Sequence, residues 1–283
     1  MDSDVKLFSV RISGAKNAQL HQKLEHATYP DQTSLSDNWA YGVPVSHIKR
    51  LVSYWKDGFD WRQQEAAPNR DLPQYTTLIH VEGFDPLKIH RVHKKGSRPG
   101  PIPLLLCHGW PGSFNEVAKI IPLLTAQTAK SIPALTSLPH LSPTSVSLLG
   151  HPSQDLHSSI VVSTYVQLLT DDEILTWISI YHFSDAGPEA SCRIYYENAH
   201  SPSAKKVEEY NLGVKLGVST FPKDLLMSPS SHCQTLGPLV FEKWHDRGGH
   251  FAAWEVPELL VEDLRVMFGG LVKSGELKFA GHK

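Results

Sequence analysis

An aspartate and a histidine near the C-terminus are the residues of this chain best suited to chemistry. Asp224 stands at the end of a predicted buried strand, and His250 follows the loop Asp246-Arg247-Gly248-Gly249 after the next predicted strand. A carboxylate that accepts a hydrogen bond from one imidazole nitrogen fixes the tautomer, which leaves the other nitrogen free to act as a base. The two glycines allow this loop to approach its neighbours closely. Taken alone, His250 also fits a surface or packed histidine.

A second segment, earlier in the chain, could hold an oxyanion. Residues 103–107 form an apolar run typical of a buried strand, and the glycines and proline within 108–113 prevent that strand from continuing. Such a turn leaves backbone N–H groups that can donate hydrogen bonds to a negatively charged oxygen. Ser113 is a suitable N-cap for a helix over 114–124. An ordinary connection between a strand and a helix is the alternative interpretation.

The elements that must position these residues form a mixed α/β pattern. Hydrophobic alternation predicts strands at 7–12, 75–81, 87–92, 103–107, 214–221 and 239–244. Helical periodicity predicts helices at 18–26, 45–55, 59–65, 114–124, 174–183, 192–199 and 257–271, with Thr170 as the N-cap before 174–183. Residues 126–159 are dense in Ser, Thr, Pro and His without either period, so this segment is predicted to be irregular.

Length and composition limit the class of protein. The chain has 283 residues, of which 41% are hydrophobic, and a formal net charge of −2. This content is enough for a sizeable core, and the charge gives no support for a nucleic-acid partner. No apolar run is long enough to cross a bilayer, so no membrane anchor is predicted. Three widely spaced cysteines favour a reducing compartment, and we expect a cytoplasmic protein.

The sequence predicts no cofactor and no metal. No glycine-rich phosphate loop follows a strand, so a nucleotide cofactor has no support. His140, His151 and His157 lack the spacing of metal ligands and have no cysteine pair nearby.

Three separated blocks carry a family resemblance. The first holds Trp39-Ala40-Tyr41-Gly42-Val43-Pro44 and the aromatic-rich segment 54–62, the second is 108–113, and the third, 172–269, contains Asp224 and His250. Together they resemble the microsomal-type epoxide hydrolases, which are α/β-hydrolases with an N-terminal meander and helical extension. In α/β-hydrolases the acid and then the histidine follow the nucleophile along the chain.

The resemblance implies an α/β-hydrolase fold that is incomplete in the middle. Residues 1–98 would form the N-terminal extension and the first strands, and 99–125 the oxyanion strand, turn and helix. Residues 126–160 would be the irregular Ser/Pro-rich segment, and 161–283 the C-terminal part of the hydrolase domain.

The same resemblance implies roles for individual residues. His250 corresponds to the family's general base and Asp224 to the acid that orients it, while Trp110 would supply an oxyanion-hole backbone N–H. Tyr195 matches one of the two tyrosines that hydrogen-bond the epoxide oxygen, and the adjacent Tyr196 is an alternative. A phenol can donate to a developing alkoxide because its reference pKa is about 10. Ordinary helix packing is the other interpretation of both tyrosines.

The aspartate nucleophile and the lid that the family reaction requires are not evident. The nucleophile should stand on a tight elbow between residues 113 and 171, but this interval is much shorter than in the family. Its only aspartate, Asp155, has no glycine two residues to either side, and Pro152 is unlike a buried central strand. We therefore assign no nucleophile. A truncated or mis-spliced product and a diverged protein both fit, and the compositional break at Ala126 favours the first.

Three functions stay open on this basis. The first is an epoxide hydrolase that forms a vicinal diol in intact homologues and has weak or absent activity here. The second is a non-catalytic protein that binds an apolar ligand. The third is an epoxide-opening cyclase with Tyr195 as the acid and the Asp224 and His250 pair as the base. The expected partner is a small apolar epoxide, and no oligomeric state is predicted.

Overall fold

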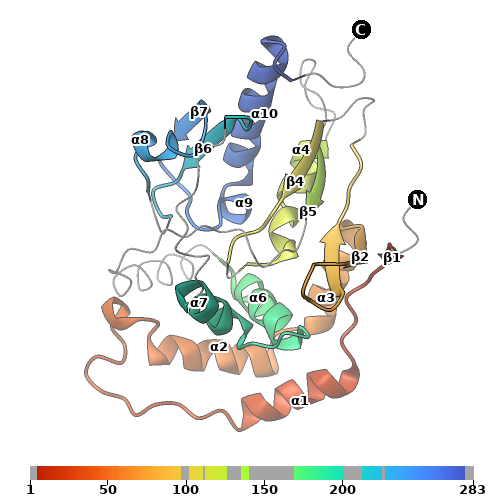
Figure 1. Cartoon of the computed structure of the whole chain (residues 1–283). Helices are drawn as coiled ribbons and strands as arrows, with labels where there is room; N and C mark the ends of the chain where they lie inside the picture. Colours follow the sequence, from red (N-terminus) through yellow and green to blue (C-terminus); the bar gives the residue numbers. More distant parts are fainter. Residues whose placement is uncertain are drawn as a thin grey trace. The chain divides into compact units, whose positions relative to one another are not determined.

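The computed structural model divides the chain into two compact units. One, called here the sheet unit, comprises Met1–Ser9, Asp71–Val146 and His200–Lys283; the other, the helical unit, comprises Val10–Arg70 and Ser147–Ala199 (Figure 1). The residues described are 5–96, 102–110, 112–125, 135–139, 169–200, 212–224 and 227–277. The segment 135–139 is described by its backbone.

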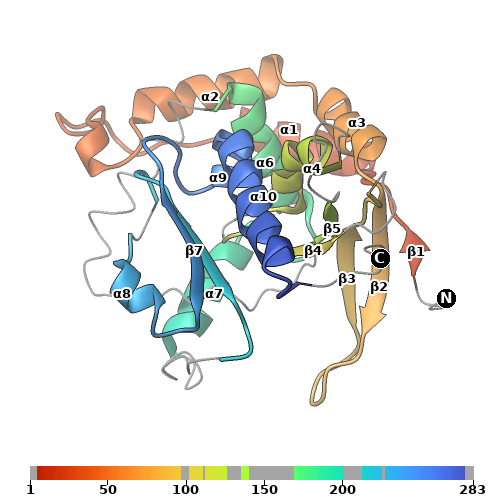
Figure 2. The same cartoon turned by 90° about the horizontal axis from the view of Figure 1, so that it is seen from above.

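The described part of the sheet unit consists of short groups of strands and of helices (Figure 2). β1 (Lys6–Leu7), β2 (Gln74–Ile79) and β3 (Leu87–Val92) are antiparallel, with Tyr75 opposite Arg91. Two parallel pairs follow, β4 (Ile102–Leu106) with β5 (Leu135–Pro139), and β6 (Leu216–Thr220) with β7 (Leu239–Trp244). The helices are η2 (Phe114–Ala118), α4 (Ile120–Thr125), α8 (Ser230–Cys233), α9 (Ala252–Glu255) and α10 (Pro257–Lys273).

In the sheet unit, α10 contacts β6, β7 and α4 (Figure 2). Pro257 stands in its first turn, where the missing N–H is tolerated. Val261 of α10 is buried, as are Ile120 and Leu124 of α4. Each such side chain contributes about 1.5 to 3 kcal/mol of hydrophobic stabilisation on full burial. The helix thereby covers the two strands that lead to Asp224 and His250.

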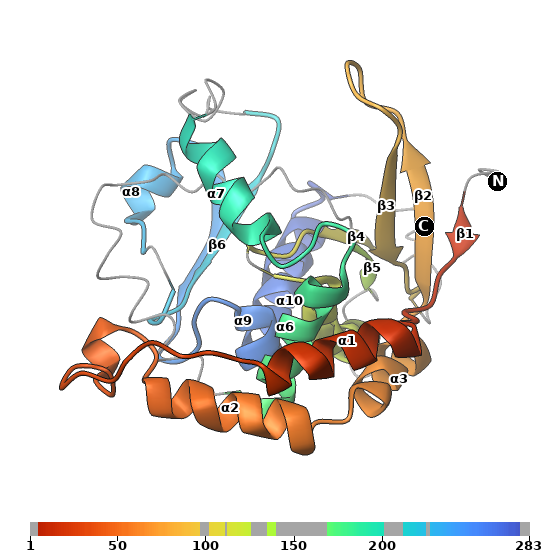
Figure 3. The same cartoon turned by 90° about the horizontal axis from the view of Figure 1, so that it is seen from below.

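The described part of the helical unit consists of helices and their connections (Figure 3). The elements are α1 (Gly14–Glu25), η1 (Trp39–Tyr41), α2 (Val45–Asp57), α3 (Trp61–Asp71), α6 (Asp171–Phe183) and α7 (Ala190–His200). Its core cluster joins Leu20 of α1, Phe59 and Trp61 at the start of α3, and Leu175 and Phe183 of α6. These residues come from both segments of the unit, so tertiary packing holds together pieces that are more than 100 positions apart in sequence.

Most predicted elements are confirmed, and two predictions are corrected. The predicted strand 7–12 ends at Leu7 because the N–H groups of Val10 and Ile12 donate to the side chains of Asn69 and Glu65 instead of to a strand. The segment predicted to be irregular contains β5, which pairs in parallel with β4. A five-residue strand has too few residues to show a period, so its partner strand decides its conformation.

Both predicted helix caps are confirmed. The Thr170 side chain accepts from the N–H of Glu173, and the Glu173 side chain accepts from the N–H of Thr170, which forms a capping box at the start of α6. Ser113 and Glu116 form the same motif at the start of η2. Such caps satisfy N–H groups that the first helical turn leaves without a partner.

Candidate active site

The structure brings the two residues predicted to form a base and its orienter into direct contact. His250 Nδ1 lies 2.9 Å from Asp224 Oδ1, and their side chains are 15% and 34% exposed. Because an ionised aspartate only accepts hydrogen bonds, this contact favours the tautomer of a neutral imidazole that has the proton on Nδ1 and the lone pair on Nε2. Nε2 is buried and has no hydrogen-bond partner among the residues that the structure describes. This arrangement suits a general base.

Two adjacent loops deliver this pair from the ends of β6 and β7. The N–H of Lys223 donates to the carbonyl of Gly248 at 3.1 Å, and Lys223 and Gly249 form an isolated parallel bridge. Gly248 has a backbone φ of +90°, which residues with a side chain rarely adopt. A Cβ there would also stand 2.5 Å from a methyl group of Val256. The glycine before the bridge is therefore required by conformation and by space.

The turn after β4 is built around a buried carboxyl group. Ser113 donates its N–H to Glu116 Oε1 at 3.0 Å, and the Glu116 side chain is buried. A Cβ on Gly112 would overlap this carboxyl oxygen and the carbonyl oxygen of Gly109. Trp110, the proposed oxyanion donor, is half-buried in the same turn. Sequence reasoning assigned no role to Glu116, although the spacing Ser113-x-x-Glu116 is the signature of a capping box.

Electrostatics at this turn favour neutral side chains. Burial raises the pKa of Glu116 to about 8, against backbone hydrogen bonds from Ser113 and Gly109 that lower it. Burial also lowers the pKa of His108, more than its hydrogen bond to the Gly109 carbonyl raises it. At neutral pH the turn therefore holds a carboxylic acid and a neutral imidazole.

The oxyanion turn and the histidine loop meet within the sheet unit. A Cβ on Gly109 would lie 3.1 Å from Cε1 of Phe251. The Phe251 ring in turn lies against the His250 ring, with 4.8 Å between centroids. Lys119 Nζ stands 4.0 Å from the centroid of the Trp254 ring, a second link between the two regions. The predicted oxyanion segment and the predicted base thus occupy one neighbourhood.

The two candidate tyrosines belong to the helical unit. Tyr195 and Tyr196 lie on α7, and both are exposed. Burial of part of its ring raises the pKa of Tyr195, so its phenol stays protonated at neutral pH. The role of Tyr195 as a hydrogen-bond donor to an epoxide stays a prediction.

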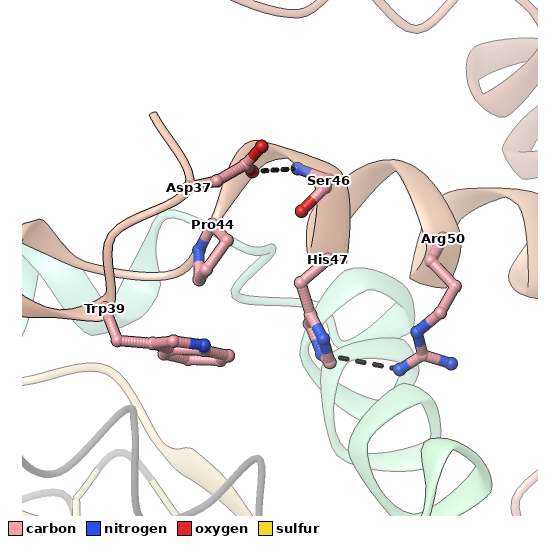
Figure 4. A pocket seen from close by; sticks show the side chains of 6 residues that line it. All are labelled: Asp37, Trp39, Pro44, Ser46, His47 and Arg50. Carbon is pink, nitrogen blue, oxygen red and sulfur yellow. Dashed lines mark hydrogen bonds between the residues drawn. The ribbon is translucent and has the colours of Figure 1, made fainter. Parts of the chain in front are cut away.

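The helical unit also has an open pocket of about 340 Å³ beside η1 and α2, lined by Asp37, Trp39, Pro44, Ser46, His47 and Arg50 (Figure 4). Asp37 accepts from the N–H of Ser46 at 3.0 Å. The Arg50 guanidinium makes a two-pronged ion pair with Asp171, at 2.5 and 2.9 Å. Because this cation is already neutralised, the pocket offers little free positive charge, and it contains none of the predicted catalytic residues.

Several predictions concern residues outside the described part of the chain. Asp155, the weak candidate nucleophile, is among them, as are His140, His151 and His157. Among the described residues, no three metal-ligating side chains gather at one point. None of the described helices has the length and hydropathy needed to cross a bilayer.

Comparison with known proteins supports the resemblance in the N-terminal part. Residues 5–117 match a family model described as epoxide hydrolase N terminus. This range includes the aromatic-rich front block and the oxyanion turn. Epoxide hydrolase 1 of Oryctolagus cuniculus is 40% identical over 130 residues, which cover 44% of this chain and 27% of that protein. This match therefore spans about a quarter of the length of the mammalian relative.

A longer alignment shows that the chain is shorter than one of its relatives. A predicted epoxide hydrolase of Stigmatella aurantiaca is 26% identical over 381 positions, covering 92% of this chain and 84% of that protein. Because 92% of 283 residues is about 260, about 120 of the aligned positions have no counterpart in this chain. The alignment thus supports the prediction that internal sequence common in the family is absent.

Solved structures establish the fold. The chain superimposes on the epoxide hydrolase of Aspergillus niger with a TM-score of 0.72 and 20% identity, covering 94% of this chain and 96% of that one. It superimposes on the juvenile hormone epoxide hydrolase of Bombyx mori with a TM-score of 0.76 and 18% identity, covering 96% and 95%. These similarities confirm the predicted α/β-hydrolase fold.

Proposed function

We propose that this chain, which resembles the epoxide hydrolases, binds a small apolar epoxide and carries the water-activating half of that family's active site in His250 and Asp224. The observation that supports this proposal most directly is the 2.9 Å contact between these two side chains, together with the buried, unpartnered Nε2 of His250. An imidazole in this state can accept a proton from water.

The family reaction has two steps. An aspartate carboxylate attacks an epoxide carbon, the carbon–oxygen bond breaks, and the alkoxide takes a proton from a tyrosine, the role proposed for Tyr195. Water then attacks the carbonyl carbon of the resulting ester, the ester bond breaks, and a diol and the free carboxylate are released, while the two protons of the water return to the departing alkoxide and to the tyrosinate. In this second step His250 Nε2 would take the proton of the attacking water, while Trp110 would donate its N–H to the developing oxyanion.

We expect this chain to perform the first step poorly. No nucleophilic aspartate is evident in the sequence, and removal of the nucleophile from a triad enzyme lowers turnover by about a million-fold. Diol formation from an apolar aryl epoxide should therefore stay close to the uncatalysed rate. A rate near that of the Aspergillus niger enzyme, abolished by Asp155→Asn, would overturn this expectation and identify the nucleophile.

The water-activating half can be tested without a nucleophile. An apolar 4-nitrophenyl ester supplies the acyl carbon directly, so water attack and loss of nitrophenolate need only a base and an oxyanion site. We expect hydrolysis above the blank that falls by about 10²- to 10⁴-fold in His250→Gln, the usual contribution of a general base. His232→Gln, at an exposed histidine of α8 in the same unit, is the matched control and should hydrolyse the ester normally.

Equal ester hydrolysis in the parent chain, His250→Gln and the blank would refute a water-activating role. Such a result would favour the second candidate, an apolar-ligand-binding protein on the same scaffold. The observation behind this candidate is the lack of about 120 positions of the aligned family sequence. It predicts saturable binding of the aryl epoxide, measured by calorimetry, without turnover.

A further inference from the structure

A second histidine–carboxylate pair lies in the sheet unit, beside the two strands that lead to the first pair. Asp263 of α10 accepts hydrogen bonds at one oxygen, Oδ2, from Ser219 Oγ at 2.7 Å and from His245 Nε2 at 2.6 Å. Ser219 belongs to β6, and His245 directly follows β7. Lys243 Nζ lies 3.2 Å from the other oxygen, Oδ1. One carboxylate therefore ties both strands of the parallel pair to the helix that covers them.

Both side chains of this second pair are buried, and the Asp263 carboxyl group is ionised. The side chains of His245 and Asp263 are 4% and 2% exposed. Burial acts to raise the pKa of Asp263, but hydrogen bonds from His245, Ser219 and Lys243 outweigh burial and hold the pKa below its usual value. A buried carboxylate is retained only where such partners compensate its desolvation. The Asp263 carboxylate and its hydrogen-bonding partners therefore fix one another's positions.

Each strand carries its contact to Asp263 five residues before its active-site side chain. Ser219 precedes Asp224 by five positions, and His245 precedes His250 by five. The N–H of His245 donates to the carbonyl of Thr220 at 2.9 Å. The two strand ends thus diverge into the two functional loops from a point held by Asp263.

The stacked rings of His245 and Phe221 connect the buried pair to the backbone of Asp224. His245 stacks on Phe221, with 4.7 Å between centroids and an 8° angle between planes. The carbonyl of Phe221 accepts from the N–H of Asp224 at 3.1 Å. A change at the buried pair would therefore reach the backbone of Asp224 through two direct contacts.

The strands need such a constraint because their pairing is irregular. β6 and β7 pair with each other as a two-stranded group within the described residues, and their register shifts between Leu216 and Gly217. A slip of one residue would move every side chain of a strand to the opposite face. Side-chain contacts at the strand ends therefore favour the correct register over registers that are shifted by one residue.

We propose that Asp263, His245 and Ser219 are positioning residues that hold Asp224 and His250 in hydrogen-bonding register. The catalytic meaning of this inference rests on the proposed function, because it assumes that the held pair activates water. The competing explanation is that the buried pair only stabilises the fold. The two explanations differ in what happens to His250 when the protein is still folded.

Nuclear magnetic resonance of the full chain with ¹⁵N-labelled histidine gives that readout. The Nδ1–H of His250 is identified by its disappearance in His250→Gln, and its exchange with water is compared with that of backbone amides in β2 and β3, which report global opening. Two variants are tested, Asp263→Asn and the milder Ser219→Ala. Glu258→Gln is the matched control, since Glu258 is on the same helix and pairs with Arg247 at the surface, at 2.8 Å.

We expect Asp263→Asn to raise exchange of the His250 ring proton by about tenfold or more, or to abolish its signal, relative to the reference amides. Ser219→Ala removes one neutral hydrogen bond and should raise exchange by about fivefold. Glu258→Gln should leave it unchanged. If Asp263→Asn does not fold, Ser219→Ala decides the question.

An unchanged His250 ring proton in a folded Asp263→Asn or Ser219→Ala protein overturns the inference and leaves the pair a stabilising one. This readout needs no turnover, so it separates the two hypotheses. Faster ring-proton exchange in a chain that does not hydrolyse the 4-nitrophenyl ester supports positioning and refutes the proposed function. Unchanged exchange in a chain that hydrolyses the ester refutes only the positioning role.

Discussion

The sheet unit contains two histidine–aspartate pairs near the ends of the same two strands. The pairs differ in burial and in the number of their hydrogen-bond partners. His250 and Asp224 are 2.9 Å apart and partly exposed, and His250 keeps a ring nitrogen without a partner among the described residues. His245 and Asp263 are 2.6 Å apart and buried, and the carboxylate also contacts Ser219 and Lys243. A pair that does chemistry must leave a nitrogen available, whereas a pair that fixes structure uses its donors and acceptors on protein partners.

The largest expected effect comes from removing each carboxylate in turn. Asp263→Ala should lower the free energy of unfolding by about 3 to 5 kcal/mol, because it leaves the donors of His245 and Ser219 and the partly exposed Lys243 ammonium without their acceptor. Asp224→Ala removes a hydrogen bond at a partly exposed site and should cost about 1 kcal/mol. Urea denaturation at pH 7 measures both values.

Equal losses in Asp263→Ala and Asp224→Ala would break the distinction between the two pairs. A large loss in Asp224→Ala with a small one in Asp263→Ala would reverse it. Ser53→Ala, at an exposed position of α2 in the helical unit, is a control that should leave the transition unchanged.

The buried carboxyl group of Glu116 sharpens the comparison, because among the described residues no cation shifts its pKa. Its pKa is raised from 4.5 to about 8, so the folded state holds the proton more tightly than the unfolded state. The stabilisation is complete below pH 4.5 and is lost as the pH rises toward 8, with a slope of up to about 1.4 kcal/mol per pH unit. Asp263, whose pKa is lowered, has the opposite sign and loses its contribution only in acid.

Glu116→Gln should remove this alkaline loss, since the amide does not titrate and can still accept from the N–H of Ser113. Urea denaturation at pH 5, 6, 7 and 8 measures the slope in both proteins. The difference between variant and parent is the relevant quantity, because buried His108 titrates in the same window with the opposite sign. Glu276→Gln, at an exposed ion pair with Lys215, is the control. Parallel pH profiles of parent and Glu116→Gln would show that Glu116 is ionised in the folded protein.

The smallest effect is expected at the surface contact between the histidine loop and α10. Arg247 and Glu258 form an ion pair at 2.8 Å, with side chains 58% and 51% exposed. Exposed pairs contribute about 0.2 to 1 kcal/mol and are screened by salt. Arg247→Gln should therefore change the unfolding free energy by less than about 1 kcal/mol, and less at 1 M salt than at 0.05 M. A loss as large as that of Asp263→Ala would mean that the surface pair stabilises the protein as much as the buried one does.

Local patterns predicted most of the elements. The Thr170 and Ser113 caps, the amphipathic α10 and the strands β6 and β7 are each specified by residues close together in sequence. The order of Asp224 and His250 relative to the predicted strands indicated that they would meet, and they do. Glu116 was within reach of the same reasoning through its capping-box spacing.

What the sequence could not predict depends on distant partners. β5 is a strand because β4 pairs with it, and the predicted strand at 7–12 stops early because side chains at 65 and 69 take its N–H groups. Ser219, His245 and Asp263 have no common spacing or motif, so nothing in the sequence indicates that their side chains converge on one carboxylate.

The sequence by itself therefore determined the family resemblance, the residue types at the candidate site and the absence of an evident nucleophile. Only the tertiary structure decided which of two histidines keeps a ring nitrogen without a partner among the described residues and which hydrogen-bonds a buried carboxylate. The physical reason is that desolvation and hydrogen-bond geometry depend on the side chains that surround an imidazole. For His245 the surrounding side chains include Asp263, which belongs to a helix that begins twelve residues later in the chain.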